Sequence, residues 1–135
     1  MSQALEGIVV VDLSREYWAS LAAALLGDFG ARVIRVEDLS TPARDPGRDG
    51  VYPVDAVDSE ARLIHRNKES VALALASEAG CDLLGQLVSC ADVLLTDASP
   101  ENRKDWGIAD EDLLARRPEL VYAVGSLAGP LGPES

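Results

Sequence analysis

The sequence predicts an α/β protein with a Rossmann-like, mostly parallel sheet and helices on both faces. Continuous β-branched runs, such as residues 8–11, are typical of strands buried on both sides of a parallel sheet. Segments rich in Ala and Leu follow these runs, and strands that alternate with helices form doubly wound sheets. The chain has 135 residues. We therefore expect residues 1–135 to form a single α/β domain.

The first predicted unit is a strand, a helix and a second strand. The strand covers residues 8–11 and closes at Asp12, and we assign Ser14 as the N-cap of a helix over residues 17–29. Gly30 supplies the stop for that helix. Residues 32–37 alternate as the second strand. Since connections between parallel strands are almost always right-handed, we expect a right-handed βαβ unit.

A long segment at 38–62, rich in Pro, Gly and charged residues, separates this unit from the next, and such loops are usually functional or mobile. Its Arg44 and Arg48 either fold over a phosphate or balance nearby acidic residues in solvent. The remaining expected elements are a strand at 70–75, a helix from 77 or 78 to 88, a strand at 93–96, a short helix or turn at 100–107, a helix at 109–116, a strand at 120–124 and a loop at 125–135.

Charge and composition exclude several classes of function. The net charge of −11 leaves no basic patch for nucleic acid and disfavours an anionic membrane surface. An anionic small ligand requires a local cluster of Arg and Lys. No signal peptide and no apolar run of about 18 residues is visible, so we expect a cytoplasmic protein. Cys81 and Cys90 lie nine positions apart, on or near one predicted helix, which is too far for a disulfide, and we expect free thiols.

Familiar catalytic motifs are missing from the sequence. It contains no G-x-S-x-G elbow and no G-x-G-x-x-G fingerprint. His65 is the only histidine, so a metal site would lack ligands, and we expect none. We expect a hydrogen-bonding or surface role for His65. Asp12 ends a strand where α/β proteins often bind ligands, although capping the following turn is the favoured interpretation.

Several segments, in order and with matching spacing, resemble the class III CoA-transferase family. The similarity covers residues 5–133. The segments that carry it are LEGIVVVDLS at 5–14, LGDFGARVIRVE at 26–37, RNKESVAL at 66–73, ADVLL at 91–95, RPELVY at 117–122 and SLAGPLGP at 126–133.

The resemblance implies the N-terminal part of an enzyme that moves CoA between carboxylic acids. In that family an aspartate attacks the acyl-CoA thioester to form a mixed anhydride, and members are usually interlocked homodimers. The aspartate follows the G-x-x-G-P loop, so it lies beyond the end of this chain. We therefore assign no catalytic residue and expect the chain to be inactive alone, with a homo-oligomer or a partner subunit supplying the aspartate.

The resemblance also marks a site for acyl-CoA or CoA, with no covalently bound cofactor. The residues that it places near CoA are Tyr17, Trp18, Arg35, Lys68, Asp97, Ala98 and Lys104.

Three positions depart from the family pattern. Trp18-Ala19-Ser20 replaces A-G-P, which adds bulk where adenine or pantetheine would lie, although packing in a core or interface is the favoured interpretation for Trp18. Glu69 and Asp105 each replace an arginine, and each swap removes a phosphate partner and adds repulsion.

These departures keep an alternative open: a non-catalytic partner or dimerisation module with a degenerate CoA site. A generic nucleotide-binding domain is a third and weaker interpretation.

Overall fold

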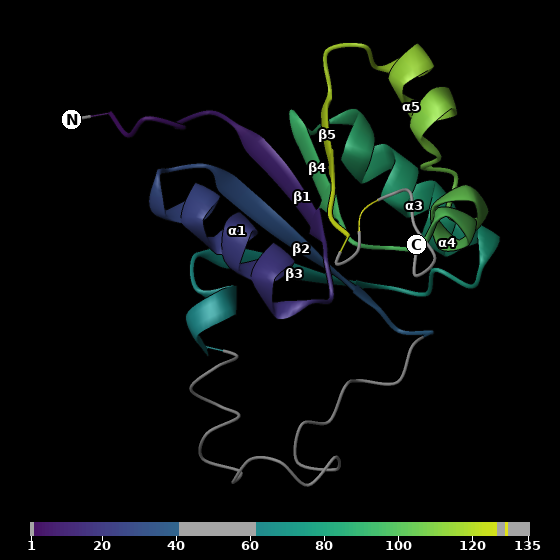
Figure 1. Ribbon diagram of the computed structural model, residues 1–135, viewed down its shortest axis with the longest axis horizontal. Helices are drawn as coiled ribbons and strands as arrows, with labels where there is room; N and C mark the ends of the chain where they lie inside the picture. The colour runs from purple at the N-terminus through teal and green to yellow at the C-terminus, as the bar shows by residue number, and fades with distance from the viewer. Residues whose placement is uncertain (1, 41–61, 127–128, 130–135) are drawn as a thin grey trace, which may run out of the picture.

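The computed structural model describes residues 2–40, 62–126 and 129. Strands and helices alternate along this part of the chain (Figure 1). The strands are β1 (Val9–Leu13), β2 (Arg32–Asp38), β3 (Lys68–Leu73), β4 (Val93–Thr96) and β5 (Val121–Val124). The helices are α1 (Tyr17–Asp28), α3 (Glu78–Ser89), α4 (Pro100–Asp105) and α5 (Asp110–Arg116).

The five strands form one sheet in the order β3-β2-β1-β4-β5, and every pair is parallel. Strand β1 lies at the centre, with β2 on one side and β4 on the other. Along the chain, β2 and β3 are added on one side of β1, and β4 and β5 are then added on its other side. The strand order therefore reverses between β1 and β4, the position where open α/β sheets usually bind ligands.

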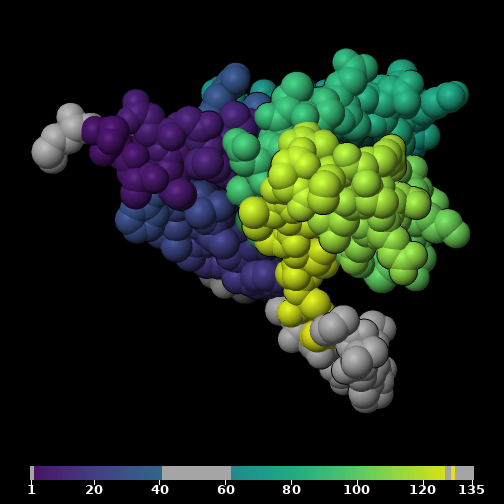
Figure 2. Space-filling view, turned by 90° about the horizontal axis from the view of Figure 1, so that it is seen from above, coloured from purple at the N-terminus to yellow at the C-terminus, as the bar shows by residue number. Residues whose placement is uncertain are grey.

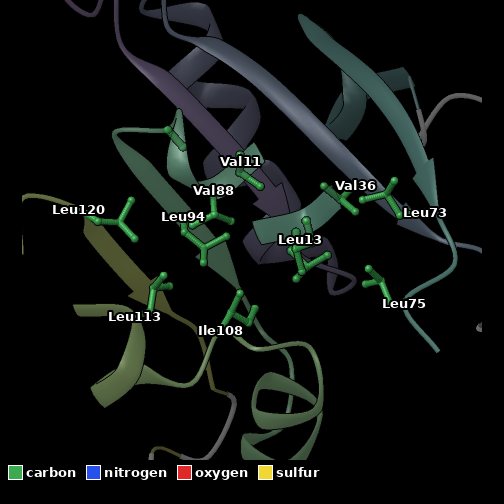
Figure 3. Packing of buried hydrophobic residues seen from close by; sticks show 12 residues of the cluster. Val11, Leu13, Val36, Leu73, Leu75, Val88, Leu94, Ile108, Leu113 and Leu120 are labelled. Carbon is green, nitrogen blue, oxygen red and sulfur yellow. The ribbon is translucent and has the colours of Figure 1, made fainter. Parts of the chain in front are cut away.

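Helices cover both faces of the sheet, which confirms the predicted fold class (Figure 1). Helix α1 packs on the face that carries Val10 and Val33, and alanines such as Ala23 bring it close. The other face carries the larger core, which α3, α5 and the segment after α4 complete (Figure 3). The buried members of this larger core are Val11, Leu13, Val36, Leu73, Leu75, Leu84, Val88, Ala91, Leu94, Ile108, Leu113 and Leu120.

Helix α1 is apolar on its outer side as well as on its inner side. Ala19, Ser20, Ala23 and Ala24 are buried, while Trp18, Leu25 and the following Phe29 are exposed. Trp18, Ala22, Leu25 and Phe29 follow helical spacing, so they share one outer face. We call these four residues the outer α1 face. Gly125, the residue after β5, lies against the Trp18 ring of this face; Figure 2 shows the outer surface of the molecule from above.

Most predicted elements are confirmed, with shifts at their ends. The strand expected at 70–75 begins and ends two residues earlier, as β3. Ser77 caps α3 by accepting the Gly80 N–H, and Gly30 has a positive φ of 101°. In the long segment, β2 continues to Asp38 and residues 62–65 form a helical turn. Arg44 and Arg48 lie outside the described residues.

The predicted cap of α1 is wrong. Glu16, not Ser14, is the N-cap residue, and its side chain makes no capping hydrogen bond. The Ser14 hydroxyl donates to the Asp12 carboxylate and lies 3.2 Å from the Ser20 hydroxyl, so it is used inside the structure. None of the described helices is long and apolar enough to cross a membrane.

Candidate functional site

The candidate site lies at the carboxyl ends of β1 and β4, where the strand order reverses. The loop after β1 runs through Ser14, Arg15 and Glu16 into α1, and the loop after β4 runs through Asp97 and Ala98 to Ser99. These two loops leave the sheet next to each other because β1 and β4 are paired. We call this end of the sheet the switch point, because the strand order reverses there; open α/β sheets usually bind ligands at such a point.

Asp97 joins the two loops. Its carboxylate accepts the backbone N–H of Arg15 at 3.0 Å and 2.9 Å, and the N–H of Glu16 at 2.7 Å. Helix α1 has no side-chain cap of its own and no acidic residue in its first turn. The Asp97 carboxylate therefore supplies the negative charge that the N-terminal end of a helix favours. The expected CoA residue Asp97 is thus engaged by the chain itself.

Asp12 and Lys68 form a buried ion pair at the carboxyl end of β1, beside the switch point. The Lys68 Nζ lies 2.7 Å from Asp12 Oδ2, and the side chains are 1% and 0% exposed. Lys68 also donates to the backbone oxygen of Ser20 at 2.7 Å, while Asp12 Oδ1 accepts the Ser14 N–H at 3.1 Å. Burial lowers the pKa of the Lys68 ammonium, and the hydrogen bond that the ammonium donates to Asp12 opposes that shift. The expected turn-capping role of Asp12 is confirmed.

Lys68 consequently ties three parts of the fold together. It starts β3, reaches the carboxyl end of β1 and holds the first turns of α1 through Ser20. Its ammonium has one N–H left after these two bonds. Lys68 therefore holds these three elements together from inside the fold. Its side chain has almost no exposed surface that a phosphate could contact.

Arg35 lies next to Asp12 in the sheet and has a more open side chain. The two residues are register partners, so their side chains point to the face that α1 covers. The Arg35 side chain is 28% exposed, and its Nη1 lies 3.3 Å from Glu37 Oε1. In the described part of the chain, its Nε is a buried donor without a hydrogen-bond partner. A guanidinium with unused donors suits a phosphate or carboxylate group.

His65 lies within reach of the charges of Arg35 and Lys68. Burial, together with these two charges, lowers its pKa to about 4. The imidazole is therefore neutral at neutral pH. Its Nδ1 is buried and has no hydrogen-bond partner among the described residues. The sequence indicated a hydrogen-bonding or surface role and did not place this ring beside Arg35.

The aromatic residues Tyr17 and Trp18 open α1 and are both partly exposed. Trp18 packs against Gly125, the residue after β5, so its ring lies over the ends of the strands. The Ala98 N–H is taken by Thr96 Oγ1 at 3.1 Å. Tyr17 and Trp18 therefore bring two partly exposed aromatic side chains to the start of α1, near the switch point.

Glu69 and Asp105, which replace arginines of the family pattern, lie on different elements of the fold. Glu69 accepts two hydrogen bonds from Arg32, each of 2.8 Å. Because side chains alternate along a strand, Glu69 points to the opposite face from Lys68 and Ser70. The expected repulsion between Glu69 and a phosphate near Arg35 is thus removed by the geometry. Asp105 and Lys104 are exposed on α4, whereas Arg103 pairs with Asp110 at 2.5 Å.

A hollow on the surface lies on the other face of the sheet. It has a volume of about 700 Å³, and its charged lining is acidic, since it includes Asp38, Glu78, Asp82 and Asp105. Cys81 lines it too, and burial together with the nearby carboxylates raises the pKa of that thiol. Both cysteines are free, as expected. This hollow suits neither an anionic ligand nor a thiolate nucleophile.

No cluster of three or more metal-ligating side chains is found in the described ranges. The described residues near the switch point include a partly exposed arginine, a neutral imidazole and two aromatic side chains. They belong to an α/β domain with a parallel sheet, a class that usually binds ligands at this point.

The comparison with known families agrees with this architecture. A sequence profile described as CoA-transferase family III matches residues 5–135, and the chain belongs to that family. The chain is 32% identical over 133 residues to (R)-2-hydroxy-4-methylpentanoate CoA-transferase of Clostridioides difficile, covering 96% of this chain and 33% of the relative. It is 31% identical over 132 residues to succinyl-CoA:glutarate CoA-transferase of Homo sapiens, covering 97% and 30%.

Solved structures give the same result. A hypothetical protein from Mycobacterium tuberculosis superposes with a TM-score of 0.81 at 30% identity, over 98% of this chain and 35% of its own. A CAIB/BAIF family protein from Brucella suis gives 0.70 at 26% identity, over 98% and 37%. The chain thus spans about a third of the length of these relatives.

Proposed function

We propose that this chain takes part in transferring CoA between carboxylic acids by supplying part of the surface that holds acyl-CoA. The observation that carries the proposal is the partly exposed Arg35 side chain, whose buried Nε has no partner in the described structure. It lies one strand from the switch point, on the face that α1 covers. In a protein of net charge −11, an anionic ligand requires a local cation of this kind.

The chemistry follows from the family to which the chain belongs. An aspartate carboxylate attacks the thioester carbonyl, CoA leaves as its thiolate, and a mixed anhydride remains on the enzyme. The resemblance places this aspartate after the G-x-x-G-P loop. We propose that residues 1–135 bind CoA but do not transfer it without an aspartate from outside these residues, in a homo-oligomer or a partner subunit.

Individual residues receive different roles in this proposal. Arg35 and the exposed Lys104 contact phosphate groups, and Tyr17 and Trp18 offer ring faces to adenine or pantetheine. Ala98 lies beside CoA in the loop between β4 and α4. Lys68 and Asp97, whose charged groups are engaged by the chain, position the loops around CoA.

Isothermal titration of CoA into the 135-residue chain at low salt tests the proposal. We expect binding that Arg35→Ala weakens about tenfold or more, because a charge-assisted phosphate contact is lost. Arg32→Ala is the matched control: it removes the same charge from β2 on the opposite face, and binding should be unchanged. Undetectable binding at millimolar CoA, or equal weakening by both variants, would overturn the proposal.

A second function is favoured by a separate observation. The outer α1 face exposes Phe29 at 59% and Leu25 at 46%, and Val121 on the edge strand β5 is 60% exposed. Apolar surface of this kind marks interaction sites. The alternative is therefore a non-catalytic partner or dimerisation module with a degenerate CoA site.

Sedimentation tests this alternative. Self-association that Leu25→Glu abolishes and Leu83→Glu on α3 preserves would support the module, since Leu83 is similarly exposed on another helix. A monomer at high concentration would count against self-association.

A further inference from the structure

The two sides of strand β4 differ in burial. Leu94, which belongs to the larger core, is 0% exposed, whereas Val93 and Leu95 on the α1 side are only partly buried. The difference grows on the edge strand β5, where Val121 is 60% exposed. Register partners share one side of a parallel sheet, so Val121 and Ala123 lie beside Val93 and Leu95. We call these four residues the open sheet face.

Helix α1 covers only the neighbouring part of this side of the sheet. Beneath it, Val10 of β1 is 0% exposed and Val33 of β2 is 1% exposed. The connections that lead toward β5 lie on the opposite side, because right-handed crossovers in that direction place α3, α4 and α5 there (Figure 1). A further parallel strand beside β5 would place its crossover on that opposite side too. Continued winding of the same kind therefore leaves the open sheet face uncovered.

The chemistry of the open sheet face fits a helix. Parallel sheets are normally covered on both sides, and helices are the elements that cover them. The face consists only of Val, Leu and Ala side chains, and Trp18 of the outer α1 face lies at its end, against Gly125. A helix with apolar residues along one stripe can pack on such a surface and bury it from water.

Charge decides where that helix comes from. The open sheet face has no charged residue, but the chain carries a net charge of −11. Glu6 and Glu119 are exposed just before β1 and β5, at the amino ends of the strands. A second copy of this chain would bring the same negative charge to the face. A helix with Lys and Arg beside its apolar stripe would instead be attracted to it.

We propose that the open sheet face binds an amphipathic helix of another protein, whose apolar stripe is flanked by basic residues. The proposal rests on the second function given above, the partner module, and makes it specific. It needs no CoA site. In the complex the helix lies over β4 and β5 beside α1, so that both sides of the sheet are covered along its whole width.

A labelled synthetic peptide of about 15 residues, made of Leu at helical spacing with Lys between, is the probe. Fluorescence anisotropy should show that it binds the 135-residue chain, and Val121→Glu should weaken binding about tenfold or more, because a carboxylate then meets the apolar stripe. Leu83→Glu is the matched control: it adds the same charge at an exposed leucine of α3, on the other side of the sheet, and binding should be unchanged.

Two peptide controls test the chemistry of the partner. A peptide of the same composition with its Leu residues dispersed around the helix should bind about tenfold more weakly or less, and so should a peptide with Glu in place of every Lys. Equal binding of the dispersed peptide would reduce the result to net charge and overturn the proposal. Equal binding of the Glu peptide would overturn the basic partner.

The outcomes separate this proposal from the two functions above. Self-association that Val121→Glu abolishes would show that a second copy covers the face, and would overturn the helix while supporting the module. Peptide binding that persists in Arg35→Ala, with CoA binding lost, would support the helix independently of the CoA site. No peptide binding by the wild type would overturn the proposal.

A measurement on the wild type decides if Val121→Glu fails to fold. Adding the Leu and Lys peptide should shift the NMR signals of residues 93, 95, 121 and 123. Shifts confined to α3 or α5 would overturn the proposal, because those helices lie on the other side of the sheet.

Discussion

The ring of Trp18 lies against the α-carbon of Gly125: a β-carbon added at Gly125 would lie 2.1 Å from Trp18 Cη2. This contact connects the first turn of α1 to the end of β5, two elements at opposite ends of the described chain. Gly125 is fixed there because its N–H also donates a hydrogen bond to the backbone carbonyl oxygen of Thr96 at 2.8 Å. The first prediction concerns this pair.

Gly125→Ala should lower the free energy of unfolding by about 1–3 kcal/mol, because the indole must move out of its place. Gly85→Ala is the matched control: it lies within α3 with open space around it and should stabilise by about 0.5–1 kcal/mol. Urea unfolding of both variants, and of Trp18→Ala with and without Gly125→Ala, provides the measurement. If Gly125→Ala costs the same in the Trp18→Ala background, the contact does not matter.

The buried pair between Lys68 and Asp12 should be essential for stability. Lys68→Met leaves the Asp12 carboxylate buried without its counter-charge, and we expect a loss of about 3–5 kcal/mol. Changing Asp12→Leu in the same chain should recover part of this loss, because no lone charge then remains. Denaturant midpoints measure both. Arg32→Met, at an exposed pair, should have a much smaller effect, and an equal effect would contradict the prediction.

His65 should make stability depend on pH. Its pKa is about 4 in the folded chain, against about 6.5 for an ordinary histidine. Between these values the unfolded chain binds more protons, so the free energy of unfolding falls as pH decreases from 6.5 to 4. We expect a loss of about 2 kcal/mol over this window, allowing for partial exposure.

The measurement is the difference between wild type and His65→Gln in urea unfolding at several pH values. His65 is the only histidine, so this difference isolates it from the carboxylates that both proteins share. The difference should change between pH 6.5 and 4 and level off above pH 7. A constant difference over the whole range would show that His65 titrates normally.

Glu69→Arg should not improve CoA binding, although it restores the charge found in the family. The side chain at position 69 points to the face opposite Arg35, and the substitution places two guanidinium groups together at Arg32. Titration with CoA should give an unchanged affinity and thermal unfolding a lower midpoint. Tighter CoA binding would mean that the phosphates lie on the other face of the sheet.

The sequence predicted most of the elements because their signals are local. Gly30 and Ser77 mark the end of α1 and the start of α3, and the β-branched runs mark the central strands. The position of Glu69 could also have been predicted, since alternation along β3 puts it opposite Lys68. The hydrogen bonds from the Arg15 and Glu16 amides to Asp97, and the contact of Lys68 with Asp12, join distant parts of the chain, for which local patterns carry no signal.

Strand β1 pairs with β2 in one direction and β4 in the other, and it alone joins the two halves of the sheet. Residues 9–13 therefore serve as a shared template: without them, β3-β2 and β4-β5 would be separate strand pairs, which are marginally stable in water. During synthesis this template is made before either partner. One edge of β1 stays unpaired until residues 32–38 of β2 have been synthesised. Its other edge stays unpaired until β4, which begins at Val93, has been synthesised. Segments that aggregate in newly made chains should therefore include residues 9–13.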